Sequence, residues 1–178
     1  KTLKIEAENG EAKFVTVDMG EPVLSPRDIP VIFDGERMVN EPLQVMGKEY
    51  RITAVSMGNP HAVVFIDRSP REFPLEQVGP LFEHHPCFPD RTNTEFAFVQ
   101  DRQNIEMRVW ERGSGETLAC GTGACATAVA AILGGYVDHR VTVHLLGGDL
   151  QISWSGKAED SVMMTGPATT VFSGKIDL

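Results

Sequence analysis

The 178-residue sequence predicts an α+β fold, in which a curled, antiparallel-rich sheet or barrel wraps around one central helix. Two observations support this fold class. Short segments in which apolar and polar residues alternate dominate the chain, which is typical of half-buried strands. A single alanine-rich run, residues 118–136, carries almost no charge, which is typical of a helix covered on most sides.

The strand segments are separated by short turn sequences that contain Gly, Pro, Asn or Asp. Within the segment 105–111, Ile105, Met107 and Val109 alternate and are expected to share one face of a strand. Eight segments are predicted to form strands: 12–20, 43–55, 61–67, 95–101, 105–111, 141–146, 150–156 and 161–166.

Two segments predict helices. Residues 74–85 are short and contain Gly79-Pro80, which weakens the helical pattern. Residues 123–133 are rich in alanine, the best helix former, and Gly134-Gly135 follows as a stop signal. Cys125, which lies within this helix, is expected to pack in the core as an inert thiol.

Composition and charge exclude several classes of protein. Hydrophobic residues make up 42% and charged residues 23%, as in ordinary globular proteins. The net charge of −9 without a basic cluster argues against nucleic acid and membrane partners. No apolar run approaches the length of a membrane span. Three cysteines do not form a disulfide framework, so a reducing, cytoplasmic location is expected.

The segment "ETLACGTGACATAVAAILGG" places a thiol directly before the predicted helix. Cys120 is expected in the N-cap region of the helix, where the positive end of the dipole would lower the pKa of its thiol. The backbone N–H groups of Gly121 and Thr122 could hold an anion, such as a carboxylate, beside the sulfur. The structural alternative is a tight strand-to-helix turn with a buried cysteine.

Other polar residues lie next to predicted strands. Glu111 and Arg112 end a strand just before a glycine-rich loop, where they could bind an ammonium and a carboxylate group. Asn59, His61 and Asn93 lie where turns lead into strands, a common place for ligand-binding side chains. A surface ion pair, a structural histidine and an ordinary turn asparagine are the corresponding structural alternatives.

A zinc site in "EHHPCFPD" is disfavoured. His84, His85 and Cys87 are potential ligands, but neighbouring histidines diverge and the usual fourth ligand and paired spacing are missing. No metal is therefore expected.

The motifs "MGNPHAVVF", "RTNTEFA" and "ERGSGETLACGTGACA" together resemble the second half of diaminopimelate epimerase, a cofactor-independent amino-acid epimerase. The resemblance runs along nearly the whole chain in order. It implies two pseudo-symmetric domains, each with strands curled around a central helix. It also implies interconversion of LL- and meso-diaminopimelate, in which one cysteine removes the α-proton and another returns a proton from the opposite face.

The resemblance also implies roles for individual residues. Cys120 is one of the two acid/base thiols, and Glu111 holds the reacting ammonium and pairs with a cysteine. His61 tunes the partner thiol. Gly121 and Thr122 bind the reacting carboxylate. Asn59, Asn93 and Arg112 bind the distal amino-acid end of the substrate.

The family's other cysteine motif is not found in this chain, which opens at Lys1 as a fragment or a processed form would. We expect a missing N-terminal half to supply the second cysteine, and this chain alone to be inactive. Residues 1–20 and 166–178 are expected to belong with the missing domain, and residues 21–165 to form the C-terminal epimerase domain. The proline-containing segment 21–31 could be the crossover, and a homodimer is left open.

Three other functions remain open at this stage. The chain could belong to a proline-racemase-like or other related isomerase. It could be a thiol hydrolase or transferase, with Cys120 as nucleophile and His61 as base. It could also be a non-catalytic module that binds carboxylates.

Overall fold

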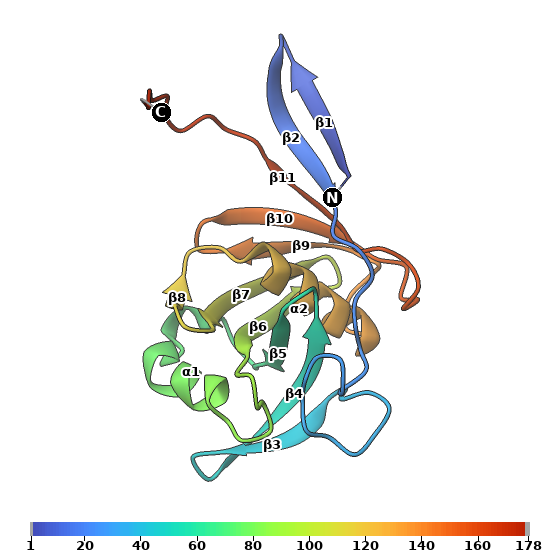
Figure 1. Ribbon diagram of the computed structural model, residues 1–178, viewed down its shortest axis with the longest axis vertical. Coiled ribbons are helices and arrows are strands. Elements are labelled where there is room, and N and C mark those ends of the chain that lie inside the picture. Colours follow the sequence, from blue (N-terminus) through green and yellow to red (C-terminus); the bar gives the residue numbers. More distant parts are fainter. Residues whose placement is uncertain (1, 177–178) are drawn as a thin grey trace.

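The computed structural model describes residues 2–176, and this part of the chain forms one eleven-stranded sheet with two α-helices and a short 3-10 turn at Pro70–Glu72 (Figure 1). The helices are α1 (Leu75–Glu83) and α2 (Gly121–Leu133). The strands are β1 (Leu3–Glu8), β2 (Glu11–Asp18), β3 (Glu41–Val45), β4 (Lys48–Ser56), β5 (Pro60–Phe65), β6 (Asn93–Asp101), β7 (Asn104–Glu111), β8 (Gly115–Thr117), β9 (Arg140–Leu145), β10 (Gly148–Ser153) and β11 (Met163–Pro167).

The order of the strands confirms the predicted α+β class. The sheet runs β1-β2-β11-β10-β9-β7-β6-β5-β4-β3, with β8 paired beside β7. Neighbouring strands are antiparallel except in two pairs, β5–β6 and β7–β9, which are parallel. The sheet curls around α2 and stays open, with β1 and β3 at its two ends, so the barrel form of the prediction is not reached (Figure 1).

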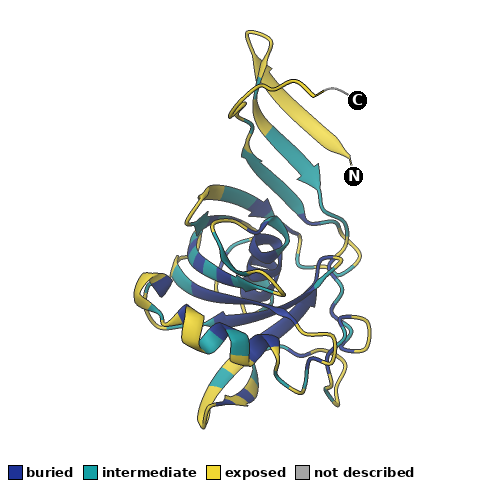
Figure 2. Cartoon of the chain, turned by 60° about the vertical axis from the view of Figure 1, so that its left-hand side comes forward, coloured by how far each residue is buried: buried dark blue, intermediate teal, exposed yellow. Residues whose placement is uncertain are grey.

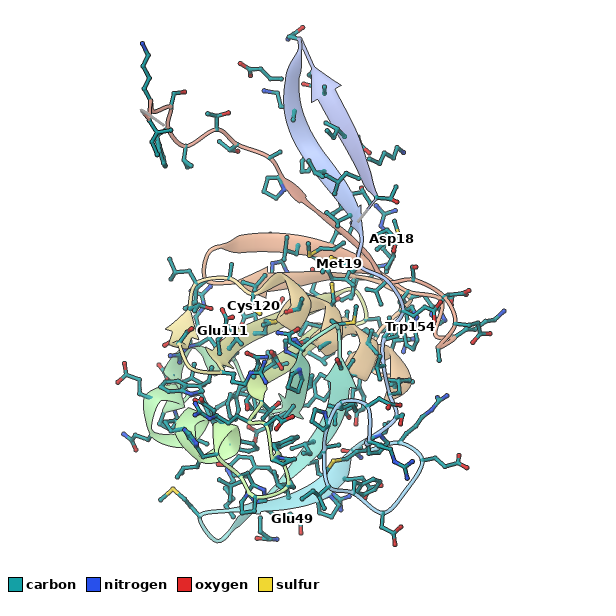
Figure 3. All side chains as sticks on the ribbon, in the orientation of Figure 1. Asp18, Met19, Glu49, Glu111, Cys120 and Trp154 are labelled. Atoms are coloured by element: carbon teal, nitrogen blue, oxygen red, sulfur yellow. The ribbon has the colours of Figure 1, made fainter. Side chains whose placement is uncertain are left out.

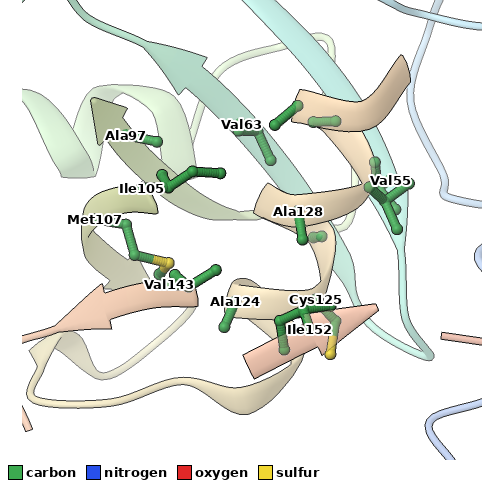
Figure 4. Packing of buried hydrophobic residues seen from close by; sticks show 14 of the residues in the cluster. Val55, Val63, Ala97, Ile105, Met107, Ala124, Cys125, Ala128, Val143 and Ile152 are labelled. Carbon is green, nitrogen blue, oxygen red and sulfur yellow. The ribbon is translucent and has the colours of Figure 1, made fainter. Parts of the chain in front are cut away.

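Helix α2 is the centre of the larger core, as the alanine-rich run predicts. Residues 123–131 are all buried, and α2 contacts β4, β5, β6, β9 and β10. Alanine side chains are small, so strands can approach the helix closely on several sides. Figure 4 shows Ala124, Cys125 and Ala128 of α2 surrounded by strand residues such as Val63 and Ile152. Cys125 is fully buried there, as predicted.

The opposite face of the sheet carries a second core under α1. Leu75 and Phe82 of α1 pack on Phe96 of β6, and the Phe82 and Phe96 rings meet edge to face at 5.4 Å. Ile29 and Val31 from the proline-containing segment 21–31 are buried in the same cluster. β6 therefore lies between two apolar layers, which fixes its position at the middle of the fold.

The structure differs from the sequence predictions at several element boundaries. The predicted strand 43–55 is a hairpin, because Met46 and Gly47 both adopt positive φ and reverse the chain between β3 and β4. The expected glycine loop after β7 contains the short strand β8. Helix α2 begins at Gly121, two residues before the predicted start. β1 lies outside the eight predicted strand segments, although strands were expected within residues 1–20.

The β1–β2 hairpin projects from the body of the molecule, and β11 links it to β10 (Figures 1 and 2). All six residues of β1 are exposed. Large apolar side chains are exposed on the hairpin and in the segment after β11: Leu3, Ile5, Phe14, Val171, Phe172 and Ile176. In the described part of the chain, no helix is long and apolar enough to span a membrane.

Candidate active site

Three strand ends bring the predicted polar residues to one edge of the sheet. β5 begins at Pro60 and β6 at Asn93, and because these strands are parallel both starts lie at the same edge, with His61 opposite Asn93 in the register. β7 runs antiparallel to β6, so its final residue, Glu111, reaches that edge as well. Motifs 50 residues apart in sequence are thereby neighbours in space.

Cys120, predicted in the N-cap region of the helix, is the N-cap residue of α2 because the helix begins at Gly121. Its backbone is extended, with φ −137° and ψ 107°, and its sulfur accepts the backbone N–H of Gly123 at 3.4 Å. The Thr122 hydroxyl lies 3.6 Å from the sulfur. Gly121 and Thr122 are the first two residues of the helix, where N–H groups lack intrahelical acceptors and favour anions. Figure 3 shows Cys120 above Glu111 on the same side of the molecule.

The expected lowering of the Cys120 pKa is wrong. Burial raises the pKa of the thiol to about 11, and the negative charges of Glu95 and Glu111 act in the same direction. Hydrogen bonds from Thr122 and Gly123 oppose this effect without overcoming it. The helix dipole by itself favours the thiolate, but desolvation and two carboxylates outweigh the dipole here.

Glu111 is held by a residue that the sequence reasoning missed. The hydroxyl of Thr117 donates a short hydrogen bond to the Glu111 carboxylate. This contact spans the β7–β8 hairpin, in which Glu111 pairs with Gly115. No sequence signal marked Thr117, because its role depends on the hairpin that forms within the supposed loop. The contact keeps the carboxylate next to the strand that leads into Cys120.

Asn93 links two of the strand ends. Its side-chain N–H donates to the backbone oxygen of Pro60 at 2.8 Å, and its side-chain oxygen accepts the backbone N–H of Arg112 at 2.9 Å. The Arg112 side chain is exposed and donates to the backbone oxygen of Asp90 at 3.0 Å. The Asn93 side chain therefore fixes the backbone of Arg112 next to the start of β5.

His61 is completely buried and both of its ring nitrogens have partners. Nδ1 lies 2.6 Å from Oε1 of Glu95, and Nε2 lies 3.0 Å from Oδ1 of Asn59. Glu95 was missed by the sequence reasoning, although it is a charged residue directly before the apolar run 96–99 of strand β6. An acid in such a strand position is a signal that could have identified it, because buried carboxyl groups require a partner.

Glu83, on α1, supports the loop after β7. Its carboxylate accepts the indole N–H of Trp110 at 2.7 Å and the backbone N–H of Gly113 at 2.9 Å. Arg91 lies 3.6 Å away and adds an ion pair. Glu83 is buried, so these contacts fix the residues that flank Glu111 and Arg112.

The residues considered for zinc do not assemble a metal site. Among the described residues, no group of three or more His, Cys, Asp or Glu side chains is arranged to hold a metal ion. His85 Nδ1 instead lies 3.0 Å from the sulfur of Cys87, and His85 Nε2 lies 3.2 Å from the backbone oxygen of Gln44.

Comparison with known proteins finds strong similarity to one enzyme family. The sequence model described as diaminopimelate epimerase matches residues 53–171, a range that includes every predicted site residue. A diaminopimelate epimerase from Acetivibrio thermocellus is 54% identical over 178 residues, which is 100% of this chain and 63% of that protein. One from Methanococcus maripaludis is 52% identical over 178 residues and is covered to 64%. The chain therefore spans a little under two thirds of the length of these relatives.

Solved structures support the fold. A probable proline racemase from Agrobacterium radiobacter K84 has a TM-score of 0.72 at 13% identity, with 98% of this chain and 56% of that chain covered. A hydroxyproline epimerase from Agrobacterium vitis has a TM-score of 0.66 at 15% identity, covering 93% and 52% of the two chains. At these identities the likeness concerns the fold alone. By the family match and the identity of its relatives, the chain belongs to the diaminopimelate epimerase family.

Proposed function

We propose that this chain contributes the Cys120 half of a diaminopimelate epimerase that works without pyridoxal phosphate. The reaction interconverts LL- and meso-diaminopimelate by proton transfer at the α-carbon. The relatives that bear this name are about half again as long as the chain, so the complete reaction is a proposal for a protein of the family's full length.

The observation that carries the proposal is the position of Cys120 at the N-cap of α2. A thiol there can exchange a proton with a substrate whose carboxylate binds the N–H groups of Gly121 and Thr122. Charge develops on that carboxylate as the α-proton leaves, and the helix N-terminus is oriented to stabilise it. Glu111, beside the thiol, is suited to the substrate ammonium.

The distal end of the substrate is assigned to Asn59, Asn93 and Arg112. These residues come from the edge formed by β5, β6 and β7, next to Glu111. The Arg112 guanidinium is exposed and can form paired hydrogen bonds with a carboxylate. A substrate with a second amino-acid end can place a carboxylate on the Arg112 guanidinium, whereas proline has no second carboxylate to place there.

We infer that the second thiol comes from the part of the family's length that this chain does not span. Cys125 lies five residues along α2 from Cys120 and therefore points in a different direction. Cys87 packs with the second core, under α1. Residues 21–165 form the epimerase domain in this proposal, and residues 1–20 and 166–178 pack against the other domain, which would cover the exposed apolar residues of β1. A cytoplasmic location fits the absence of a disulfide among the described residues.

Hydrogen exchange in D₂O tests the proposal. A family-length protein that contains this chain is incubated with LL-diaminopimelate, and proton NMR follows the α-proton. We expect loss of the signal together with formation of the meso isomer, and no exchange with Cys120→Ala. Cys87→Ala is the matched control and retains activity. Persistence of the α-proton with folded wild-type protein would contradict the function, and turnover by residues 1–178 alone would contradict the need for a second thiol.

The rival functions predict different products. A proline-racemase-like enzyme would invert proline and leave diaminopimelate unchanged in the same assay. A thiol hydrolase would form an acyl adduct on Cys120, visible by mass spectrometry with an ester substrate. The hydrolase mechanism is disfavoured because both ring nitrogens of His61 are already engaged by Glu95 and Asn59, which leaves neither free to act as the base for Cys120.

A further inference from the structure

Glu95 is a buried carboxyl group that lies between two residues of the site. Its side chain is 0% exposed, and its Oε1 is 2.6 Å from Nδ1 of His61. A Cβ atom placed on Gly123 would lie 2.7 Å from this same oxygen and 3.2 Å from the sulfur of Cys120. The carboxyl group and the thiol are thus within about 6 Å of each other, a range over which one charge affects the ionisation of another.

The second oxygen of Glu95 has no hydrogen-bond partner among the residues that the structure describes. Burial without a donor disfavours the carboxylate, and desolvation accordingly raises the pKa of Glu95 above its usual range. A proton on Oε1 would be donated to Nδ1 of His61, and the Nε2–H of His61 would then be donated to Oδ1 of Asn59. This chain of bonds holds the imidazole in one orientation.

Few charged groups act on this region. Glu95 from β6 and Glu111 from β7 act on the Cys120 thiol, and His61 from β5 and Glu111 act on Glu95. The first turn of α2 has no acidic residue and its last turn has no basic residue. The carboxyl group of Glu95 lies beside the turn that carries Cys120, so that once it is ionised its negative charge disfavours the thiolate of Cys120.

We propose that Glu95 is a positioning residue of the Cys120 site, whose buried carboxyl group fixes the His61 ring and holds Cys120 as a protonated thiol. The inference rests on the proposed epimerase function only for its consequence, which is that Cys120 enters the reaction as the proton donor. Gly123 is part of the same arrangement, since any side chain there would separate Glu95 from the thiol.

The experiment measures alkylation of Cys120 by iodoacetamide as a function of pH in residues 1–178, with the modified peptide quantified by mass spectrometry. Glu95→Gln keeps the size of the side chain and removes the carboxyl group that can ionise. We expect the pH midpoint for Cys120 to fall by about one unit or more. Glu106→Gln is the matched control, because Glu106 also has a buried oxygen without a partner among the described residues but lies far along β7. In Glu106→Gln, the pH midpoint for alkylation of Cys120 should equal that of the wild type.

An unchanged Cys120 midpoint in folded Glu95→Gln protein would overturn the inference. If that variant does not fold, ¹⁵N NMR of the His61 ring in the wild-type chain tests the inference instead. The ring resonances are expected to shift as Cys120 ionises, to lose this shift in Cys120→Ser and to retain it in Cys87→Ser. A His61 signal that does not respond to Cys120 contradicts the coupling.

The catalytic consequence is read separately in the family-length protein. In the direction in which Cys120 donates its proton, Glu95→Gln should move the alkaline limb of kcat/KM to lower pH, in parallel with the alkylation midpoint. Neither alkylation nor NMR requires a substrate. A lack of exchange with diaminopimelate would therefore refute the proposed function but not the effect of Glu95 on Cys120. An unshifted Cys120 midpoint in an active enzyme would refute only the role of Glu95.

Discussion

The side-chain oxygen of Asn93 accepts the backbone N–H of Arg112 at 2.9 Å, and so joins the start of β6 to the residue that follows β7. The amide nitrogen of Asn93 also donates to the backbone oxygen of Pro60, before His61. One buried side chain thereby holds three segments of the site together. The contribution of Asn93 to the stability of the fold can be measured in the absence of a substrate.

Asn93→Ala should lower the free energy of unfolding by about 2 kcal/mol, because it leaves the buried backbone oxygen of Pro60 and the backbone N–H of Arg112 without these partners. Urea denaturation measures this loss. Gln44→Ala, on the exposed side of β3, is the control and should change stability by no more than about 0.5 kcal/mol. Equal stability of the two variants would show that the Asn93 hydrogen bonds contribute nothing to the fold.

Gly123→Ala and Gly121→Ala should differ although both add one methyl group to the first turn of α2. Alanine is favoured over glycine within a helix by about 1 kcal/mol. At Gly123 the methyl group would lie 2.7 Å from the buried Glu95 carboxyl oxygen, which is held by His61. At Gly121 the nearest atom is the sulfur of the flexible Met164 side chain, at 3.2 Å.

Thermal unfolding should therefore show a lower Tm for Gly123→Ala than for the wild type, and a Tm for Gly121→Ala that is close to it or higher. The Tm of Gly123→Ala falls only if the stability lost through the clash with Glu95 exceeds the stability gained from the higher helix propensity of alanine. A stabilised Gly123→Ala protein would mean that Glu95 moves aside easily, which is incompatible with a fixed contact at this turn.

Glu83→Gln should destabilise the protein in a pH-dependent way. Burial acts to raise the pKa of Glu83, but hydrogen bonds from Trp110 and Gly113 and the charges of His84 and Arg91 hold the pKa below its ordinary value of 4.5. The folded state therefore binds this proton less readily than the unfolded state. The resulting stabilisation is present above about pH 4.5 and is lost as the pH falls through the lower folded value.

At neutral pH the Glu83→Gln variant should lose about 2 kcal/mol, as expected for buried hydrogen bonds to a charged group. The difference from the wild type should shrink below about pH 4.5. Urea unfolding followed by tryptophan fluorescence measures both effects. Glu72→Gln, an exposed acid on the 3-10 turn, is the control and should follow the wild type at every pH.

The reactivity of Cys120 and Cys87 should be low at neutral pH. Burial raises the pKa of each thiol to about 11, and the thiolate is the reactive form. Alkylation of both should accelerate about tenfold per pH unit on approach to that value. Peptide-resolved mass spectrometry at several pH values provides the rates. Modification of Cys120 faster than that of free cysteine at neutral pH would restore the lowered pKa that the sequence favoured.

The same pKa values affect stability at alkaline pH. An unfolded thiol titrates near 9.0, so between this value and about 11 the folded state retains protons that the unfolded state has lost. The stabilisation from the buried thiols is complete below about pH 9 and decreases as the pH rises through 11. Cys120→Ser should unfold with a weaker dependence on pH in this window, as urea titrations would show.

Local sequence determined the elements and the place of the thiol. An alanine-rich run without charge forms a helix wherever strands can cover it, and the alternation of Ile105, Met107 and Val109 fixes the buried face of β7. A cysteine directly before such a helix becomes its N-cap through backbone geometry, which is local. The motif around Cys120 also carried the family resemblance, since its residues are contiguous.

Only the tertiary structure decided the protonation and the internal bonding of the site. The Cys120 pKa depends on burial and on Glu95, which lies 25 positions earlier in the chain and becomes a neighbour only when β6 passes beneath α2. The hairpin that gives Glu111 its partner Thr117 formed in what the sequence presented as a loop. Electrostatic effects depend on distance and solvent exposure in space, and neither quantity can be obtained from the order of residues along the chain.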